Sequence, residues 1–359
     1  MKIKKIELFG YRNYDSTVIE FDDGLNIIEG KNAQGKTNLL EAIYYCAVGK
    51  SFRASREKEV IKWNGDIAKI KLTINKEIGN KIIEIIFSKS NKKTIKIDGI
   101  PILKIGELFG ELNAVFFSPD ELKLIKDSPE DRRRFMDVSL SQVYKDYFYS
   151  ISKYNKILQS RNKCLKTITD VNSLKQMLSV YNIQIASICL KIKKYRQSFL
   201  EKLNPYAKLA HNYITSGQEE INLEYSGIIE NSEQDILKAL SQSEDKDIKM
   251  GFTTYGVHKD DIKVTVNGVD VRTFGSQGQQ RTVALSMKLA ELEIIKQDTK
   301  AVPILLLDDV LSELDNTRKL KLLKFCSKAQ TFLTCTEFKF DVPCHRINIC
   351  EGNAKIIKD

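Results

Sequence analysis

Eight consecutive residues near the N-terminus have the types and the spacing needed to bind a chain of phosphates. They match the pattern G-x-x-x-x-G-K-[ST] and are Gly30, Lys31, Asn32, Ala33, Gln34, Gly35, Lys36 and Thr37. Gly30 and Gly35 let backbone N–H groups turn inward at a helix N-terminus. Lys36 would hold the β- and γ-phosphates, and the Thr37 hydroxyl would ligate Mg²⁺. The simpler alternative is a glycine-containing turn before a helix.

The segments on both sides of this loop fit the phosphate-binding role. Residues 25–28 form a short β-prone run before it. After it, apolar residues recur at helical spacing, namely Leu39, Leu40, Ile43, Tyr44 and Ala47. The sequence therefore predicts a strand, a phosphate loop and a helix in succession.

A second acidic site follows an apolar run near the C-terminus. Residues 303–309 read Pro-Ile-Leu-Leu-Leu-Asp-Asp, as expected of a parallel strand that is buried on both faces. Ligands of open α/β sheets lie beyond the carboxyl ends of the strands, so Asp308 would face the Mg²⁺ held by Thr37. Asp309 could then orient or deprotonate the attacking water. Taken alone, two acids after a strand could merely cap a turn.

A third segment indicates the class of phosphate-binding protein. Residues 275–279 read Gly-Ser-Gln-Gly-Gln and precede an apolar series of helical spacing, so this helix N-terminus is a second anion site. The segment resembles the signature of ABC-type ATPases, usually Leu-Ser-Gly-Gly-Gln. Residues 312–315, which end at Asp315, resemble the D-loop of the same superfamily. An ordinary helix cap is the alternative interpretation of residues 275–279.

The ABC resemblance implies a dimer with composite sites. In that superfamily the signature of one subunit closes on the nucleotide held by the other, so ATP and Mg²⁺ are the implied cofactors. Lys36 and Asp309 are the implied catalytic residues, and Thr37 and Asp308 the implied Mg²⁺ ligands. The signature residues expected to act in trans on the other subunit's nucleotide are Ser276, Gln277, Gly278 and Gln279.

Four further segments resemble the RecF family, the bacterial recombination mediator ATPases, and the resemblance runs essentially from end to end. These segments are residues 6–14, 49–53, 117–120 and 256–261. The resemblance implies an α/β fold: an ABC-type P-loop ATPase head with an antiparallel β subdomain and an inserted helical arm similar to a short coiled coil. It places Arg12 among the ATP-binding residues, although the sequence leaves open whether Arg12, Tyr14 or another side chain contacts adenine.

RecF resemblance also implies a function. An ATP-dependent homodimer would close on duplex DNA near a single-strand gap, and slow, DNA-stimulated ATP hydrolysis would release it. RecR is the implied partner, with RecO as a possible second one, and RecA loading is the implied indirect effect. His258, in the RecF-like segment 256–261, could lie near DNA or nucleotide, or could be a hydrogen-bonded turn residue.

Some positions depart from the wider ABC pattern. The usual catalytic Glu is replaced by Asp309, which retains a carboxylate but favours slow turnover. Residues 114–117 contain no Gln for a Q-loop, and no His follows the predicted strand at residues 331–334. Thr334 or Thr336 are the candidates for contact with the γ-phosphate instead. These departures fit a switch better than a motor.

Charge and composition are consistent with a DNA-binding protein of two domains. The 359 residues carry a net charge of +10 and are 42% hydrophobic, enough to bury a large core. Residues 121–200 hold 16 Lys+Arg and 7 Asp+Glu, nearly the whole excess. Such a stretch attracts duplex DNA by counterion release. The general alternative is a solvated helical face.

The same basic stretch shows two amphipathic helical patterns. Apolar residues recur every three or four positions from Val143 to Leu158 and again from Leu174 to Phe199. The two helices would pair antiparallel as an arm, and residues 204–205 (Asn-Pro) would end the second one. We therefore divide the chain into head residues 1–118, arm residues 119–210 and head residues 211–359. Hairpins are expected at residues 98–99 and 267–268.

Cysteine usage favours a cytoplasmic protein. The seven cysteines include no C-x-x-C pair, and an odd number gives no complete disulfide framework. Cys344, His345 and Cys350 lack the fourth ligand of a standard zinc site. No run has the length of a signal peptide or a membrane span, so no membrane contact is expected.

Two other functions belong to different classes. A transporter nucleotide-binding subunit would need the missing Q-loop Gln and switch His. An SMC-like complex that processes DNA ends would need a longer arm, paired cysteines at its tip and a nuclease site, and the sequence shows none of these.

Overall fold

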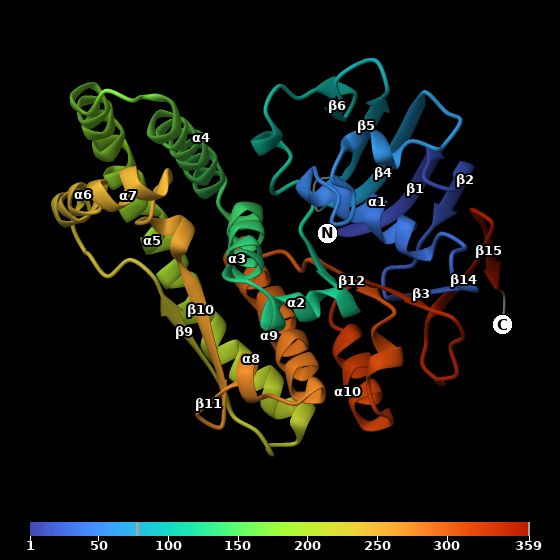
Figure 1. The fold of residues 1–359 in the computed structure, drawn as a ribbon. Coiled ribbons are helices and arrows are strands. Elements are labelled where there is room, and N and C mark those ends of the chain that lie inside the picture. The colour runs from blue at the N-terminus through green and yellow to red at the C-terminus, as the bar shows by residue number, and fades with distance from the viewer. Residues whose placement is uncertain (77–78, 358–359) are drawn as a thin grey trace.

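The computed structural model describes residues 1–76 and 79–357, and a mainly parallel sheet runs through its centre (Figure 1). The strand order is β15-β14-β3-β13-β12-β8, in which only β15 is antiparallel to its neighbour. The strands are β3 (Leu25–Glu29), β8 (Ala114–Phe117), β12 (Ile304–Asp308), β13 (Thr331–Cys335), β14 (His345–Cys350) and β15 (Asn353–Ile357). The predicted strands at residues 25–28 and 303–308 are thus confirmed.

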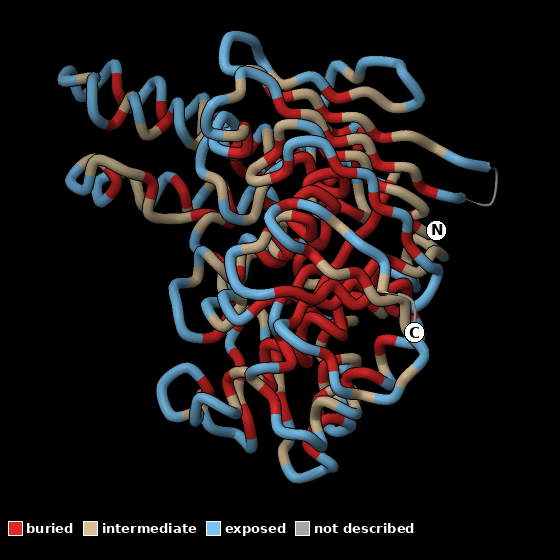
Figure 2. Tube along the Cα trace, turned by 90° about the vertical axis from the view of Figure 1, so that its right-hand side faces the viewer, coloured by how far each residue is buried: buried red, intermediate tan, exposed pale blue. Residues whose placement is uncertain are grey.

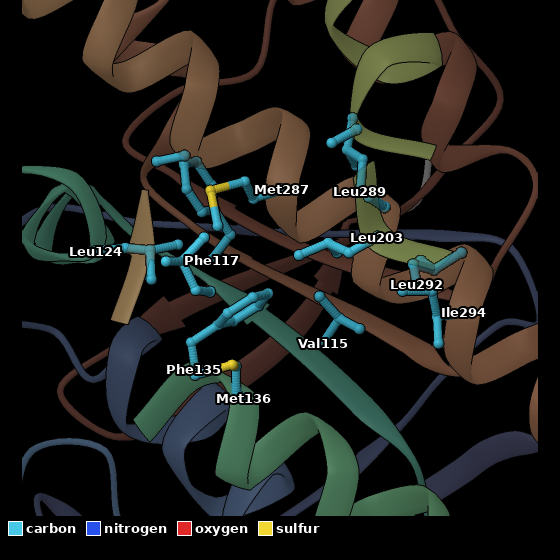
Figure 3. Packing of buried hydrophobic residues seen from close by; sticks show 14 of the residues in the cluster. Val115, Phe117, Leu124, Phe135, Met136, Leu203, Met287, Leu289, Leu292 and Ile294 are labelled. Carbon is cyan, nitrogen blue, oxygen red and sulfur yellow. The ribbon is translucent and has the colours of Figure 1, made fainter. Parts of the chain in front are cut away.

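Both faces of this sheet are covered, which explains its continuous apolar strands. Alternate residues belong to different core clusters: Phe117 and Leu307 face one, Phe116 and Leu306 the other. The first cluster includes residues of helix α9 (Gln277–Thr299; Figure 3), and the second includes residues of helix α1 (Lys36–Val48). Figure 2 shows that the buried residues concentrate in this central region.

An antiparallel sheet of order β2-β1-β4-β5-β6-β7 packs on α1 and confirms the predicted β subdomain. Its strands are β1 (Lys2–Tyr11), β2 (Tyr14–Glu20), β4 (Ile67–Lys76), β5 (Gly79–Ser88), β6 (Thr94–Ile97) and β7 (Ile100–Pro101). The predicted Asp98–Gly99 turn joins β6 to β7, and both residues have positive φ, 51° and 82°. These are the angles that a two-residue hairpin requires.

A third sheet, of order β11-β10-β9, lies beside the helical region. Its strands are β9 (Ile221–Ser226), β10 (Asp261–Val266) and β11 (Val269–Asp270). The hairpin expected at residues 267–268 joins β10 to β11, and Val266 pairs with Val269 across it. Strand β9 packs on the long helix α5, so this sheet is anchored to the helical insertion.

Helices α4, α6 and α7 lie away from the two larger sheets, whereas α9 and α10 lie nearer the parallel sheet (Figure 1). The long helix α5 packs against α4, α6 and α9. The helices are α1 (Lys36–Val48), α2 (Lys123–Lys126), α3 (Pro129–Val143), α4 (Lys145–Thr167), α5 (Val171–Thr215), α6 (Glu233–Gln242), α7 (Glu244–Met250), α8 (Val271–Phe274), α9 (Gln277–Thr299) and α10 (Asn316–Cys326). Short 3-10 turns are η1 (Glu57–Val60), η2 (Ile105–Glu107), η3 (Pro119–Leu122), η4 (Val257–Lys259) and η5 (Val310–Glu313).

The predicted end of the second arm helix at residues 204–205 is wrong. Helix α5 continues through Pro205 to Thr215. Proline removes one helical hydrogen bond, but buried contacts hold both sides of it, through Leu203 and Ala207. Asn204 adds a hydrogen bond, because its Oδ1 accepts from the Leu223 N–H at 2.9 Å. Since α5 crosses residue 210, the predicted boundary there falls inside a helix, and the three-part division stays a prediction.

Several basic residues of the arm are buried rather than solvated. Four of the cations in residues 121–200 have almost no exposed surface: Arg132, Arg161, Lys193 and Arg196. Arg161 Nη1 donates to Asp247 Oδ2 at 2.7 Å, and Arg196 Nη1 donates to Asp260 Oδ2 at 2.7 Å. Part of the charge excess therefore holds the arm together and is not available to a surface ligand.

His258 lies in this buried network. Its Nε2–H donates to the Thr253 carbonyl at 2.9 Å, and its Nδ1 accepts from the Tyr154 hydroxyl. The hydrogen-bonded turn residue is therefore the interpretation that the contacts support. Burial lowers the pKa of His258 to about 4, although the bond to the Thr253 carbonyl acts in the opposite direction.

This depressed pKa predicts a pH-dependent stability. Because His258 has a pKa of about 4 in the folded protein and about 6.5 when unfolded, the unfolded chain binds more protons between these values. Its contribution to the free energy of unfolding is complete above pH 6.5 and falls by about 2 kcal/mol between pH 7 and pH 5. The free energy of unfolding, measured with urea at pH 7 and at pH 5, should change less between these pH values in His258→Gln than in the wild type. Equal differences in the two proteins would contradict the assignment.

Candidate nucleotide site

The loop of residues 30–37 lies at the carboxyl edge of the parallel sheet, between β3 and α1. Two of its glycines have positive φ, 148° at Gly30 and 114° at Gly35. A Cβ on Gly30 would lie 2.3 Å from the carbonyl oxygen of Ile349, and one on Gly35 would meet the Asn13 side chain at 2.7 Å. Both positions therefore favour glycine for their backbone angle, and Gly30 also for its packing against backbone.

The side chain of Lys36 folds back over this loop. Its Nζ donates to the carbonyl oxygens of Gly30 at 2.5 Å and Lys31 at 2.9 Å. Burial lowers its pKa, an effect that the nearby carboxylates of Asp309 and Asp308 partly oppose. The structure thus brings an ammonium group and two carboxylates to the same edge.

Thr37 and Asp308 meet as the strand order requires. The Thr37 hydroxyl donates to Asp308 Oδ1 at 3.0 Å, and the Thr334 hydroxyl donates to the same oxygen at 2.7 Å. Burial raises the pKa of Asp308, while these two hydrogen bonds act to lower it. A hydroxyl and a carboxylate oxygen are the hard donors that Mg²⁺ prefers, so this pair fits the implied ion.

Asp309 differs from Asp308 in conformation and exposure. It follows the end of β12 with φ 50°, in the left-handed region, and its side chain is exposed. Its backbone N–H donates to the Thr334 hydroxyl oxygen at 2.9 Å. Thr334 is therefore fully buried between the two aspartates, whereas Thr336 is exposed beyond β13 and stays the freer candidate for contact with a phosphate.

The turn between β1 and β2 donates hydrogen bonds to the phosphate loop, a support that the sequence did not reveal. Asn13 Nδ2 donates to the Gln34 carbonyl at 2.8 Å, and the Tyr14 hydroxyl donates to the Gly35 carbonyl at 2.9 Å. From the other side, the Gly352 N–H donates to the Gln34 carbonyl at 3.2 Å. Tyr14 is fully buried, so its ring is packed in the core and is not open to stack on adenine.

Arg12 is held by Glu41, a fully buried carboxylate that sequence analysis missed. Arg12 Nε and Nη2 donate to the two Glu41 oxygens at 2.8 and 2.7 Å. The Tyr11 and Ser51 hydroxyls also donate to Glu41. Burial would raise the pKa of Glu41, but hydrogen bonds from Arg12 and Ser51 lower it overall. A Glu inside the apolar pattern of residues 39–43, one turn after Thr37, was the available signal.

The signature segment begins α9 with a reciprocal cap. The Gln279 N–H donates to Ser276 Oγ at 3.2 Å, and the Ser276 N–H donates to Gln279 Oε1 at 2.9 Å. Ser276, Gln277 and Gly278 are exposed. Within residues 1–76 and 79–357, no hydrogen bond or ion pair joins residues 30–37 to residues 275–279. The exposed cap is thus open to a second molecule.

Asp315 caps α10, because its Oδ1 accepts from the Arg318 N–H at 3.0 Å. Just before it, Glu313 forms an ion pair with Arg281 in the first turns of α9. The predicted D-loop therefore contacts the helix that carries the predicted signature. These contacts place the residues without testing their roles, which stay predictions.

Other predicted features concern metals and membranes. Among the residues that the structure describes, no cluster of three or more His, Cys, Asp or Glu side chains could hold a metal ion. No helix in the described chain has the length and apolar character to cross a membrane.

The two sheets, the phosphate loop and the capped helix α9 define a P-loop head of the ABC/SMC-like class. The family model of the RecF/RecN/SMC N terminal domain matches residues 2–343. The Smc head domain of Pyrococcus furiosus shares the fold, with a TM-score of 0.58 at 19% identity over 99% of this chain and 96% of that one.

More similar relatives identify the family within this class. "DNA replication and repair protein RecF" of Clostridium kluyveri is 48% identical over 94% of this chain and 93% of its own length. The protein of the same name from Clostridium botulinum is 46% identical over 98% and 99%. The recombination mediator protein RecF of the RecFOR pathway, solved as RecF-ATP, has a TM-score of 0.91 at 34% identity over 99% of this chain and 98% of that one. The chain belongs to the RecF family.

The buried Glu41 provides a test of how the site is held. Glu41→Gln keeps the shape of the side chain but removes the charge that Arg12 requires, so the free energy of unfolding should fall by about 3 kcal/mol. Asp23→Asn is the matched control, because it removes a carboxylate from an exposed pair with Lys4 and should cost less than about 1 kcal/mol. Urea unfolding measures both. Equal losses of unfolding free energy in the two variants would show that the buried Glu41 charge stabilises the fold no more than an exposed carboxylate does.

Proposed function

We propose that this chain is a DNA repair and recombination ATPase that uses ATP binding to close a homodimer on DNA. The observation that carries the proposal is the hydrogen bond between Thr37 and Asp308, next to the phosphate loop over which the Lys36 side chain folds. A RecF relative solved as RecF-ATP supports ATP as the nucleotide. The curated relatives named for DNA replication and repair support the process in which it acts.

The expected chemistry assigns a separate task to each residue. N–H groups of residues 30–37 would bind the phosphates, and Lys36 would exchange its bonds to backbone carbonyls for the β- and γ-phosphates. Thr37 and Asp308 would hold Mg²⁺, which neutralises charge on the phosphates. Asp309, exposed and one methylene shorter than Glu, would orient the attacking water. Its shorter reach favours slow hydrolysis that acts as a switch.

A homodimer would complete each nucleotide site. Ser276, Gln277 and Gly278 are exposed at the start of α9, and in the part of the chain that the structure describes no hydrogen bond or ion pair joins them to their own phosphate loop. The N–H groups and dipole of that helix end favour an anion, so we assign them to the γ-phosphate bound by a second copy. Arg12 would contact the nucleotide while its ion pair with Glu41 holds its side chain in place.

The proposed clamp would bind duplex DNA near single-strand gaps, in the cytoplasm. RecR is the proposed protein partner, with RecO as a possible second one, and RecA loading would follow indirectly. The RecFOR pathway in which a solved relative is described supports this set of partners. Lysines of the arm that remain exposed, such as Lys153 and Lys156 beside the buried network, are the candidates for the duplex.

Removing the charge of Asp309 should separate ATP binding from hydrolysis. In Asp309→Asn, Asp308 can still support Mg²⁺, but the carboxylate that activates water is lost. We expect ATP-dependent dimers that persist and an ATPase rate at least tenfold lower. Sedimentation with ATP and a phosphate-release assay measure the two properties. Hydrolysis at the wild-type rate would show that Asp309 is not the base.

A second test asks whether Ser276 acts on the nucleotide bound by its own chain or on the one bound by a second copy. Ser276→Arg should bind ATP almost normally, because its phosphate loop is intact, yet should fail to dimerise, because a bulky cation blocks the helix N-terminus. Lys36→Met should instead lose ATP affinity and dimerisation together. A mixture of the two proteins can form one intact composite site per dimer, so partial ATPase activity should return.

Two outcomes would contradict this scheme. If Ser276→Arg hydrolyses ATP fully as a monomer, the segment is only a helix cap and the clamp is wrong. If Lys36→Met dimerises normally with ATP, the phosphate loop does not control association. A sedimentation series with ATP, ADP and duplex DNA on the wild-type protein is the reference for both.

A further inference from the structure

A basic groove lies on the antiparallel sheet, between η1 and the turn that joins β5 to β6. Its volume is about 460 Å³, and four cations and one carboxylate are among the residues that line it. The cations are Arg56, Lys58, Lys92 and Lys93, and the carboxylate is Glu57. Lys93 reaches the carboxyl end of α1, where it donates to the Gly49 carbonyl at 2.9 Å. Helix α1 has 13 residues, so this end lies roughly 20 Å from the phosphate loop.

The positive charge of this groove is largely uncompensated. Lys93 forms an ion pair with Glu57, which neutralises the carboxylate. Arg56, Lys58 and Lys92 are exposed and form no hydrogen bond or ion pair through their side chains with any other residue that the structure describes. Three unpaired cations around one hollow create a field that attracts phosphates, and exposed Asn91 adds an amide donor.

An exposed aromatic side chain lies near this groove, although it is not among the residues that line it. Trp63 is the only tryptophan of the chain, and 92% of its surface is exposed. Its turn follows η1 directly and adjoins the start of the β5–β6 turn, because Lys89 Nζ donates to the Trp63 carbonyl at 3.5 Å. In addition, the Lys89 N–H donates to the Asp66 carbonyl at 3.0 Å. The exposed indole therefore has ring faces that are open to stack on a ligand.

We propose that this groove binds an unpaired DNA strand, with its phosphates on Arg56, Lys58 and Lys92 and a base stacked on Trp63. Aromatic side chains beside cationic grooves are the usual means of holding single strands, because every base has a face to stack. In a duplex those faces are already stacked, so an exposed indole favours the unpaired strand. The inference rests on the proposed function and gives the single-stranded side of a gap its own site.

The lone tryptophan makes the site directly observable. With excitation selective for tryptophan, oligo(dT) should quench the fluorescence of the full-length protein with Mg²⁺ and ATP, because Trp63 is the only tryptophan in the sequence. A blunt duplex should leave the fluorescence unchanged while it binds elsewhere. Anisotropy of a labelled oligonucleotide, recorded in parallel, establishes that the site is saturated. An unchanged tryptophan signal at saturation would overturn the proposal.

Substitutions separate stacking from charge. Trp63→Ala should weaken oligo(dT) binding about five- to 150-fold, whereas Trp63→Phe should restore most of it. The pair Arg56→Glu and Lys92→Glu should reduce the slope of log affinity against log salt by about 1.4, or about 0.7 for each lost phosphate contact. Lys355→Glu, an exposed lysine on β15, is the matched control and should leave the affinity nearly unchanged.

The same proteins distinguish failure of this inference from failure of the proposed function. ATP-dependent dimerisation and duplex binding should be retained in all groove variants. If these variants also bind oligo(dT) as the wild type does, the groove is not the strand site, although the proposed function stands. If the wild type binds neither duplex nor gapped DNA, the proposed function itself is wrong. Loss of dimerisation in Trp63→Ala would show a structural role and overturn the inference.

Discussion

The Glu41 carboxylate, buried without exposed surface on α1, is the interaction on which the nucleotide half of the molecule depends. A charge in that position is stable only if several donors surround it, and Arg12, Tyr11 and Ser51 supply them. These donors come from the end of β1 with the residue after it, and from the segment after α1. One helix residue thereby holds two separate pieces of chain beside the helix that follows the phosphate loop.

The order and register of the strands in the parallel sheet position the remaining residues of the site. Because both faces are covered, its strands cannot slip in register without moving apolar side chains out of two cores. Asp308 and Thr334 pair across β12 and β13, so they reach the carboxyl edge at the same level. Thr37 arrives from the helix after β3, which is the next strand along. The two hydroxyls and the carboxylate meet because β3, β13 and β12 are neighbours and their carboxyl ends lie at the same edge of the sheet.

Local patterns of the sequence were sufficient for much of this architecture. The phosphate loop, the strand before Asp308 and the turns at residues 98–99 and 267–268 depend on neighbouring residues, so they could be predicted. Pro205 could not, because the contacts that tolerate it come from a strand and a helix distant in the chain. Arg161 and Arg196 were counted as surface charge, since their partners Asp247 and Asp260 are more than sixty residues away. The burial of Glu41 depends on Arg12, 29 residues earlier, and so is also not visible in the local pattern.

Helix α5 has a mechanical property that follows from Pro205. The helix has 45 residues, about 68 Å, and it packs on α4 and α6 toward one end and on α9 toward the other. At Pro205 the rod lacks one backbone bond, so bending costs least there. Helix α9 spans this point, because Lys202 Nζ donates to Asp298 before it and His211 Nδ1 hydrogen-bonds to Ser286 after it. A force on the arm tip is thus carried past the missing backbone bond by the packing of α5 on α9.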